Sequence, residues 1–236
     1  MAALHITVFL EEPQLGNSFK TIFQGAAGTA DSEDIVTDQL YWHVDASKSS
    51  SYSGSGTTWT DLISGQNATL VNGPTYSKSG TYSGGAFFFN GVDEHATTSY
   101  QKNQDAFSVS AWIKPSTQND SSPHAIVNQF ENGSAEWWAL EVQGGDRGKP
   151  AWIVDNNSVK IVLVSDDQSP NSWQMLTGTR SGASMKLYLN TSVLKTSTSL
   201  NTSTVVSLEP FQIANSLNGE YFKGYISDIK IYTKEL

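Results

Sequence analysis

Short runs in which apolar and polar residues alternate recur along most of the chain, and this period of two constrains the fold more than any other feature. In the run AFSVSAWIKP, Phe107, Val109 and Ile113 share one face, and the run stops at Pro115. Successive side chains of a β-strand point to opposite sides, so the alternation predicts a strand with one buried face. A proline ends such a strand because it lacks the N–H that a neighbouring strand would bind.

The same pattern returns in AEWWALEVQGGD, in KPAWIVDNN and VKIVLVSDD, in the run 185–190, and near the end of the chain at Ile229 and Ile231. Two adjacent asparagines, Asn156 and Asn157, mark a hairpin turn between the second and third of these runs. About a dozen short strands separated by turn residues indicate a two-sheet antiparallel sandwich. The expected fold class is therefore all-β.

Composition sets wide limits on size and partners. With 236 residues and 38% hydrophobic content, the chain can bury one large core. The net charge is −9 and the basic residues are scattered, which argues against nucleic acid as a partner. The chain has no cysteine, so disulfides and thiolate sites are excluded. No run approaches the roughly 18 apolar residues of a membrane span, so no membrane insertion is expected.

The first 37 residues differ from the rest of the chain. Alternating apolar residues predict a strand, and the short apolar piece SFKTIFQ and the small-residue, acidic passage GAAGTADSEDIVTDQ follow it. We expect residues 1–37 to form an extended docking arm and residues 38–236 to form the folded domain. The residues assigned to assembly are Leu4, Ile6, Val8, Leu10, Phe19, Ile22 and Phe23. The alternative is that the first strand extends the edge of the same sheet.

Five segments occur in an order that resembles a known family. They are WTDLISGQNATLVNGPTYSKSGTYSGGAFFFNGVDEH, FSVSAWIKP, SWQMLTGTRSGASMKLYLN, FQIA and FKGYISDIKIYTKEL. Together they resemble the laminin-G-like branch of the concanavalin A-like lectin/glucanase superfamily, a module frequent in bacterial surface proteins and phage structural proteins. The resemblance covers residues 38–236. It implies a jelly-roll sandwich whose first and last strands lie side by side, with binding at a loop rim or on the concave face.

Some relatives in this family hold calcium at a rim turn of the form FDG-x-DD. Here the turn reads FNGVDE, so Asn90 replaces the first aspartate and removes one charge. Calcium takes six to eight oxygen ligands. If the first and last strands are neighbours, the resemblance implies a calcium site made of Asn90, Asp93, Glu94 and Asp228. The alternative is a tight turn with solvated acids, and no other cofactor is expected.

A glycan site needs an aromatic platform, because the apolar face of a sugar stacks on an aromatic ring beside polar groups that bind its hydroxyls. Trp137 and Trp138 are adjacent, so on one strand they must face opposite sides. We expect Trp137 to reach the second face of its sheet, with Trp112 and Trp152 beside it on that concave surface. The alternative is that every tryptophan is structural.

Glucanases share this fold, so catalysis is a third possibility. A retaining glucanase of this architecture carries its two carboxylates on one strand as E-x-D-x-E or E-x-D-x-x-E, close together on one face. The chain contains neither string. The four histidines also lack the spacing of a metal or hydrolase motif. We therefore expect no enzyme and assign no catalytic residue.

The preferred hypothesis is a non-enzymatic virion structural protein, of the capsid decoration or fibre type, which docks through residues 1–37. Capsid or other virion proteins would be its partners, with a homo-oligomer and weak adhesion to a cell-surface glycan as further expectations. Because the N-terminus lacks the basic residues of a signal peptide, the protein would be made in the host cytoplasm and displayed on the virion surface. The alternatives are a freestanding carbohydrate-binding module and, third, a glycan hydrolase.

Overall fold

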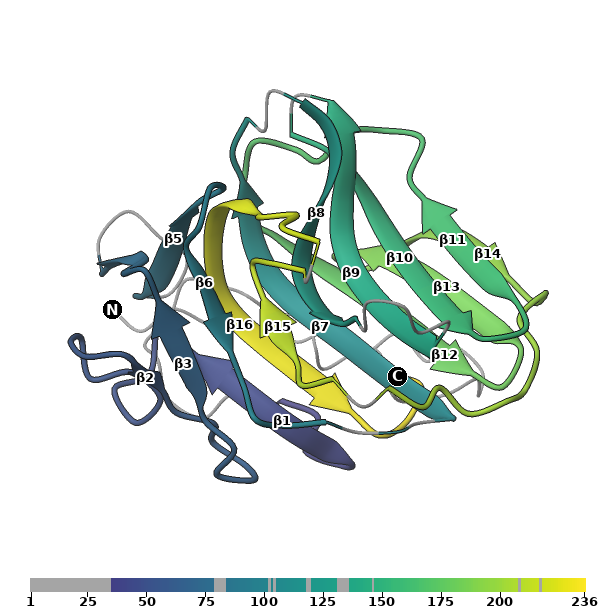
Figure 1. Ribbon diagram of the computed structural model, residues 1–236, viewed down its shortest axis with the longest axis horizontal. Coiled ribbons are helices and arrows are strands. Elements are labelled where there is room, and N and C mark those ends of the chain that lie inside the picture. Colours follow the sequence, from purple (N-terminus) through teal and green to yellow (C-terminus); the bar gives the residue numbers. More distant parts are fainter. Residues whose placement is uncertain are drawn as a thin grey trace, which may run out of the picture. The chain divides into compact units, whose positions relative to one another are not determined.

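The computed structural model describes residues 35–78, 84–101, 103, 105–117, 120–130, 136–145, 147–207, 209–216 and 218–236 (Figure 1). These residues form strands, turns and bends without a helix, so the predicted all-β class is confirmed. In this described part of the chain, no helix is long and apolar enough to cross a membrane.

The fold below belongs to the unit Thr37–Leu236. The predicted arm lies outside the described residues, and so do all seven residues assigned to it: Leu4, Ile6, Val8, Leu10, Phe19, Ile22 and Phe23. The arm and its boundary at residue 37 stay predictions.

Two antiparallel sheets stack face to face (Figure 1). The first has the order β14-β13-β12-β7-β16-β5-β4, with β1 also paired to β16. Its strands are β1 (Leu40–Asp45), β4 (Thr75–Ser77), β5 (Ala86–Asn90), β7 (Ala106–Pro115), β12 (Gln174–Ser181), β13 (Ser184–Leu189), β14 (Ser192–Ser197) and β16 (Lys223–Tyr232).

The second sheet has the order β11-β10-β9-β8-β15-β6-β3-β2. Its strands are β2 (Thr58–Trp59), β3 (Ala68–Val71), β6 (His95–Thr97), β8 (Asp120–Gln129), β9 (Glu136–Gly145), β10 (Lys149–Asn156), β11 (Lys160–Val164) and β15 (Gln212–Ile213). In Figure 1, β8, β9 and β10 run as long neighbouring strands across the front of the sandwich.

The first and last strands of the described fold are neighbours, as the family resemblance implies. Within the β1–β16 pair, Val44 lies opposite Ile229, and both are fully buried. On its other side, β16 pairs with β7, where Ile229 lies opposite Ala111. The last strand thus joins an early strand to the centre of the first sheet.

The core lies between the two sheets, and the alternation in the sequence decides which side chains fill it. On β7, the predicted inner face carries Phe107, Val109 and Ile113, and all three are fully buried. On β9 of the facing sheet, Trp138 and Leu140 are buried in the same cluster. Burying a large apolar side chain of this kind contributes about 1.5–3 kcal/mol to folding.

The predicted hairpin between β10 and β11 is also confirmed. Asp155 lies opposite Lys160, and Asn157 in the turn has a φ of 68°. Asparagine adopts this left-handed conformation more readily than other residues with a side chain, which is why it occurs in tight hairpin turns.

Candidate functional site

The outer face of the second sheet carries a hollow of about 370 Å³, which we call the β9 hollow. Alternate residues of β9 form its floor: Trp137, Ala139, Glu141 and Gln143. The residues between them point into the core, so the hollow faces away from the first sheet. At about 3.4 Å per residue, neighbouring side chains of this floor lie roughly 7 Å apart along the strand. A single strand therefore places an aromatic ring, a small residue and two polar groups in one row.

One end of the β9 hollow is aromatic. The rings of Trp137 and Phe130 pack edge to face, with centroids 4.9 Å apart. The Lys160 ammonium lies 4.6 Å from the centroid of the Trp137 ring, within the range of a cation–π contact. Phe130 follows β8 and Lys160 begins β11, so chain segments on both sides of β9 hold the indole in place.

The other end of the β9 hollow contains a buried carboxyl group. Glu141 is 3% exposed, and its cross-strand neighbours are Ala125 on β8 and Ala151 on β10, neither of which offers a polar side chain. Gln143 Nε2 donates a hydrogen bond to Glu141 Oε1 at 2.6 Å.

The surroundings of Glu141 favour its neutral form. Burial raises the pKa of Glu141 to about 7; the hydrogen bond from Gln143 opposes that rise, Glu220 adds to it, and Lys160 opposes it again. The group therefore changes charge near neutral pH, which is unusual for a glutamate.

A loop that precedes β16 forms the wall beside Glu141. Within it, Ser216 Oγ donates a hydrogen bond to Glu220 Oε2 at 2.7 Å. Two contacts fasten this loop to β8: the backbone N–H of Ala125 donates to the carbonyl oxygen of Glu220 at 3.2 Å, and Asn128 Nδ2 donates to that of Asn215 at 2.6 Å. The wall is thus held by hydrogen bonds to the sheet that forms the floor.

The three predicted glycan-site tryptophans do not lie together. Trp137 occupies the outer face of the second sheet, as the alternation with Trp138 predicts. Trp152 is fully buried in the core, where its ring packs against Phe107, so its assignment to the glycan surface is wrong. Trp112 lies on β7 of the first sheet, opposite the core face of that strand, so it is wrong as a neighbour of Trp137.

Sequence reasoning missed Phe130, Glu141, Gln143, Lys160 and Glu220 as residues of the site. A signal for Glu141 and Gln143 was present, because the alternation of β9 puts both on the same face as Trp137. The remaining residues come from other segments, and only the strand order brings them to β9.

The predicted calcium ligands do not form one site. Asn90 Oδ1 accepts hydrogen bonds from the backbone N–H groups of Val92, Asp93 and Glu94, and the Glu94 carboxylate accepts one from the backbone of Asn90. These residues therefore close their own turn. In the described ranges, no three His, Cys, Asp or Glu side chains group as a metal site requires.

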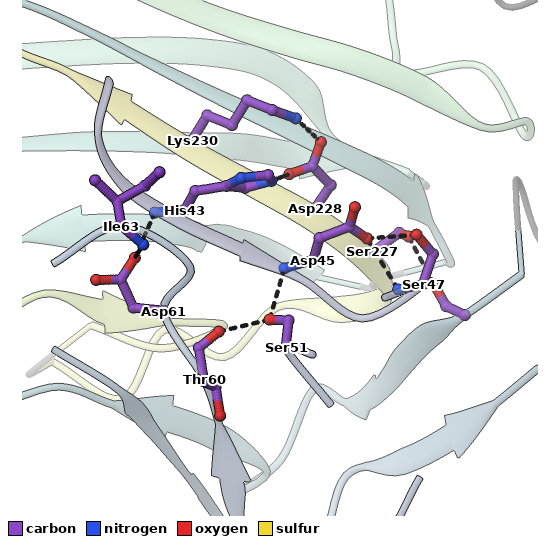
Figure 2. A network of polar contacts seen from close by, with 11 residues as sticks. His43, Asp45, Ser47, Ser51, Thr60, Asp61, Ile63, Ser227, Asp228 and Lys230 are labelled. Carbon is purple, nitrogen blue, oxygen red and sulfur yellow. Dashed lines mark hydrogen bonds and ion pairs between the residues drawn. The ribbon is translucent and has the colours of Figure 1, made fainter. Parts of the chain in front are cut away.

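Asp228 lies further along β16 and belongs to a different network (Figure 2). It accepts a hydrogen bond from His43 Nε2 at 3.0 Å and forms an ion pair with Lys230. Its cross-strand neighbour on β1 is another acid, Asp45. Burial alone would raise the pKa of Asp228, but Lys230 and His43 lower it to about 2. Burial, and then the charge of Asp228, raise the pKa of Asp45.

We expect Asp228→Asn to lower the free energy of unfolding by about 2–4 kcal/mol at pH 7, because His43 and Lys230 lose their buried anionic partner. Because the pKa of Asp228 is depressed in the folded protein, this stabilisation is present above pH 4 and is lost as the pH falls toward 2. Urea denaturation of the wild type and of Asp228→Asn at pH 7 and pH 3 measures this difference in the free energy of unfolding. Asp166→Asn breaks an exposed ion pair with Lys195 and should leave the midpoint unchanged. Equal midpoints for Asp228→Asn and wild type at pH 7 would contradict this role.

A family model described as the concanavalin A-like lectin/glucanases superfamily matches residues 89–236, well over half of the chain. Comparison with curated proteins finds no match.

Several solved structures share the fold. The binding domain of Paraclostridial Mosquitocidal Protein 1 superposes with a TM-score of 0.66 at 15% identity, over 84% of this chain and 49% of that one. The Botulinum neurotoxin serotype D binding domain gives 0.61 at 22% identity, over 84% and 48%. This chain thus spans about half the length of these two. Domain 4 of AbnA, a GH43 extracellular arabinanase from Geobacillus stearothermophilus solved with arabinotriose, gives 0.60 at 18% identity, over 84% and 94%.

Proposed function

The chain belongs to the concanavalin A-like lectin/glucanases superfamily, and from this premise we propose that residues 37–236 form a carbohydrate-binding domain without catalytic activity, whose glycan site is the β9 hollow.

One observation carries this proposal, which is the combination of an aromatic platform and hydrogen-bonding groups in one hollow. Trp137 is partly exposed and lines the hollow, and the part of its ring that Lys160 and Phe130 leave open is the apolar surface for the apolar face of a sugar ring. Glu141, Gln143 and Glu220 line the same hollow and provide acceptors and donors for hydroxyl groups. A cavity of this size with few, convergent polar groups is typical of small-ligand sites.

Similar domains add support of a second kind. This chain covers 94% of the arabinanase domain, and that domain was solved with a trisaccharide. The two toxin domains of the same fold are named as binding domains. None of the three is named as a catalytic domain, which agrees with a binding role for this chain.

We expect Trp137→Ala to weaken glycan binding about tenfold or more, a loss of about 1.4 kcal/mol, because the stacking surface is removed. A glycan array identifies a bound sugar, and isothermal titration calorimetry then measures its affinity for both proteins. Trp112→Ala is the matched control, since it removes a partly buried tryptophan from the outer face of the other sheet. If Trp112→Ala abolished binding while Trp137→Ala left it intact, the glycan site would lie on the outer face of the first sheet, and the β9 hollow would be excluded as the site.

The role as a virion structural protein is a separate and more specific proposal. It depends on residues 1–37, and it predicts that the chain without them stays folded but no longer joins its particle or homo-oligomer. The capsid partners and the virion surface location depend on the same test. The glycan-hydrolase alternative predicts turnover that depends on one or two carboxylates, which a reducing-sugar assay measures.

A further inference from the structure

The Glu141 carboxylate has one oxygen engaged and one available. Oε1 accepts the hydrogen bond from Gln143 Nε2 at 2.6 Å. Oε2 accepts none from the residues that the structure describes, yet Glu141 lines the β9 hollow. Glu141 as a whole is only 3% exposed, but Oε2 is not among the fully buried side-chain atoms that lack a partner, so this oxygen is open to the hollow and can accept a donor from a molecule bound there.

The groups around Glu141 decide which donor fits. On the flanking strands, Ala125 and Ala151 carry no charge. The wall contributes the acid Glu220, and the only cation that acts on Glu141 from the described residues is Lys160 of β11. Lys160 lies over the Trp137 ring, at the aromatic end of the hollow. An anionic ligand would therefore meet two carboxyl groups at the Glu141 end, within a chain of net charge −9.

Resting on the glycan-binding function proposed above, we propose that the β9 hollow selects an uncharged oligosaccharide, one hydroxyl of which donates a hydrogen bond to the Oε2 atom of ionised Glu141. A charge-assisted hydrogen bond of this kind is stronger than one between neutral groups. An acidic sugar is disfavoured in comparison, because its carboxylate is repelled by Glu141 and Glu220.

The spacing along β9 sets the length of the ligand. Trp137 and Glu141 are four residues apart, so about 14 Å of strand separates the aromatic contact from the acceptor. A single sugar ring is shorter than this distance. A ligand that stacks on Trp137 and donates to Glu141 therefore has at least two linked sugar units running along β9.

The bound hydroxyl also makes binding depend on pH. A donor to the carboxylate favours the ionised form, so affinity must rise as Glu141 loses its proton. Because burial places the pKa of Glu141 at about 7, the rise is centred near neutral pH. The affinity of an acidic sugar would change in the opposite direction, because the neutral form of Glu141 repels it less.

The test is calorimetric titration of the full chain at pH 5.5, 7.0 and 8.5. Neutral probes are arabinotriose, xylotriose and cellotriose, and the acidic probe is trigalacturonic acid. We expect at least one neutral trisaccharide to bind, about tenfold more tightly at pH 8.5 than at pH 5.5. Glu141→Gln should abolish this dependence on pH, and Gln143→Ala should move its midpoint to higher pH, since the lost hydrogen bond is one that favours ionisation.

The possible results distinguish a failure of this inference from a failure of the proposed glycan-binding function. Tighter binding of trigalacturonic acid, or a neutral ligand whose affinity needs Trp137 but does not change with pH, would overturn the inference and leave a glycan site at the β9 hollow. Failure of every probe to bind, joined with an empty glycan array, would overturn the proposed function itself.

Discussion

Replacing Trp152 by alanine is expected to lower the free energy of unfolding by about 3–5 kcal/mol, because the substitution leaves a cavity in a tightly packed core. The indole packs against Phe107 and Trp138, with ring centroids 5.6 and 5.9 Å away, and its Nε1 donates to the carbonyl oxygen of Thr179 at 3.1 Å. A Cβ added at Gly178 would lie 2.3 Å from Cδ2 of the indole, so the ring rests directly on the β12 backbone. Urea denaturation followed by circular dichroism measures the loss.

Trp137→Ala is the matched control, since it truncates the same kind of side chain on the outer face of the same sheet. It should cost clearly less stability while it weakens glycan binding.

Gly178→Ala tests the packing from the other side. It should destabilise the wild type by about 1–3 kcal/mol or more, and less in a Trp152→Ala background, where the methyl group enters the space left by the indole. Additive effects of the two changes would contradict the close contact.

The alternation of apolar and polar residues predicted strands well because one face of most strands is buried. β7 was predicted down to its end at Pro115, and Trp137 and Trp138 were assigned correctly to opposite faces of β9. These predictions need only the geometry of one strand, in which successive side chains point to opposite sides.

Trp152 was misplaced because β10 is apolar on both faces. Ala151 and Ile153 on one side and Trp152 and Val154 on the other are all nearly or fully buried, so alternation does not say which set faces the core. The pairing with β9 decides it, because Trp152 lies opposite the core residue Leu140. Such a register depends on contacts between strands, and no local pattern in the sequence records it.

The four predicted calcium ligands do not come together, for a related reason. The prediction that the first and last strands are neighbours was correct. Two neighbouring strands lie side by side over many residues, however, so their pairing alone does not bring any two given side chains together. Asn90 lies opposite Lys223 at the start of β16, whereas Asp228 lies five residues later, opposite Asp45. At roughly 3.4 Å per residue, this offset separates Asp228 from the turn by about 17 Å.

Glu141→Gln is expected to stabilise the protein at alkaline pH. Burial raises the pKa of Glu141 from 4.5 in the unfolded chain to about 7 in the fold. Below pH 4.5 both states hold the proton, and the group has no effect on stability. Between pH 4.5 and 7 only the folded state keeps it, so stability falls as the pH rises. Above pH 7 the full cost is about 3 kcal/mol. Chemical denaturation of both proteins from pH 4 to pH 9 should show the variant gaining on the wild type by this amount.

Gln143→Ala provides a control of opposite sign. Its amide donates to Glu141 and holds the pKa of that group down, so its loss should raise the pKa further and extend the fall in stability to higher pH. A constant difference between the wild type and Glu141→Gln across this range would mean that the carboxylate is hydrated in the hollow, and the hydroxyl acceptor proposed for it would lose its basis. A glutamine would fill the same space without this cost. An ionisable group that destabilises its own fold at neutral pH is therefore expected where the charge serves a ligand, since functional sites commonly trade stability for activity.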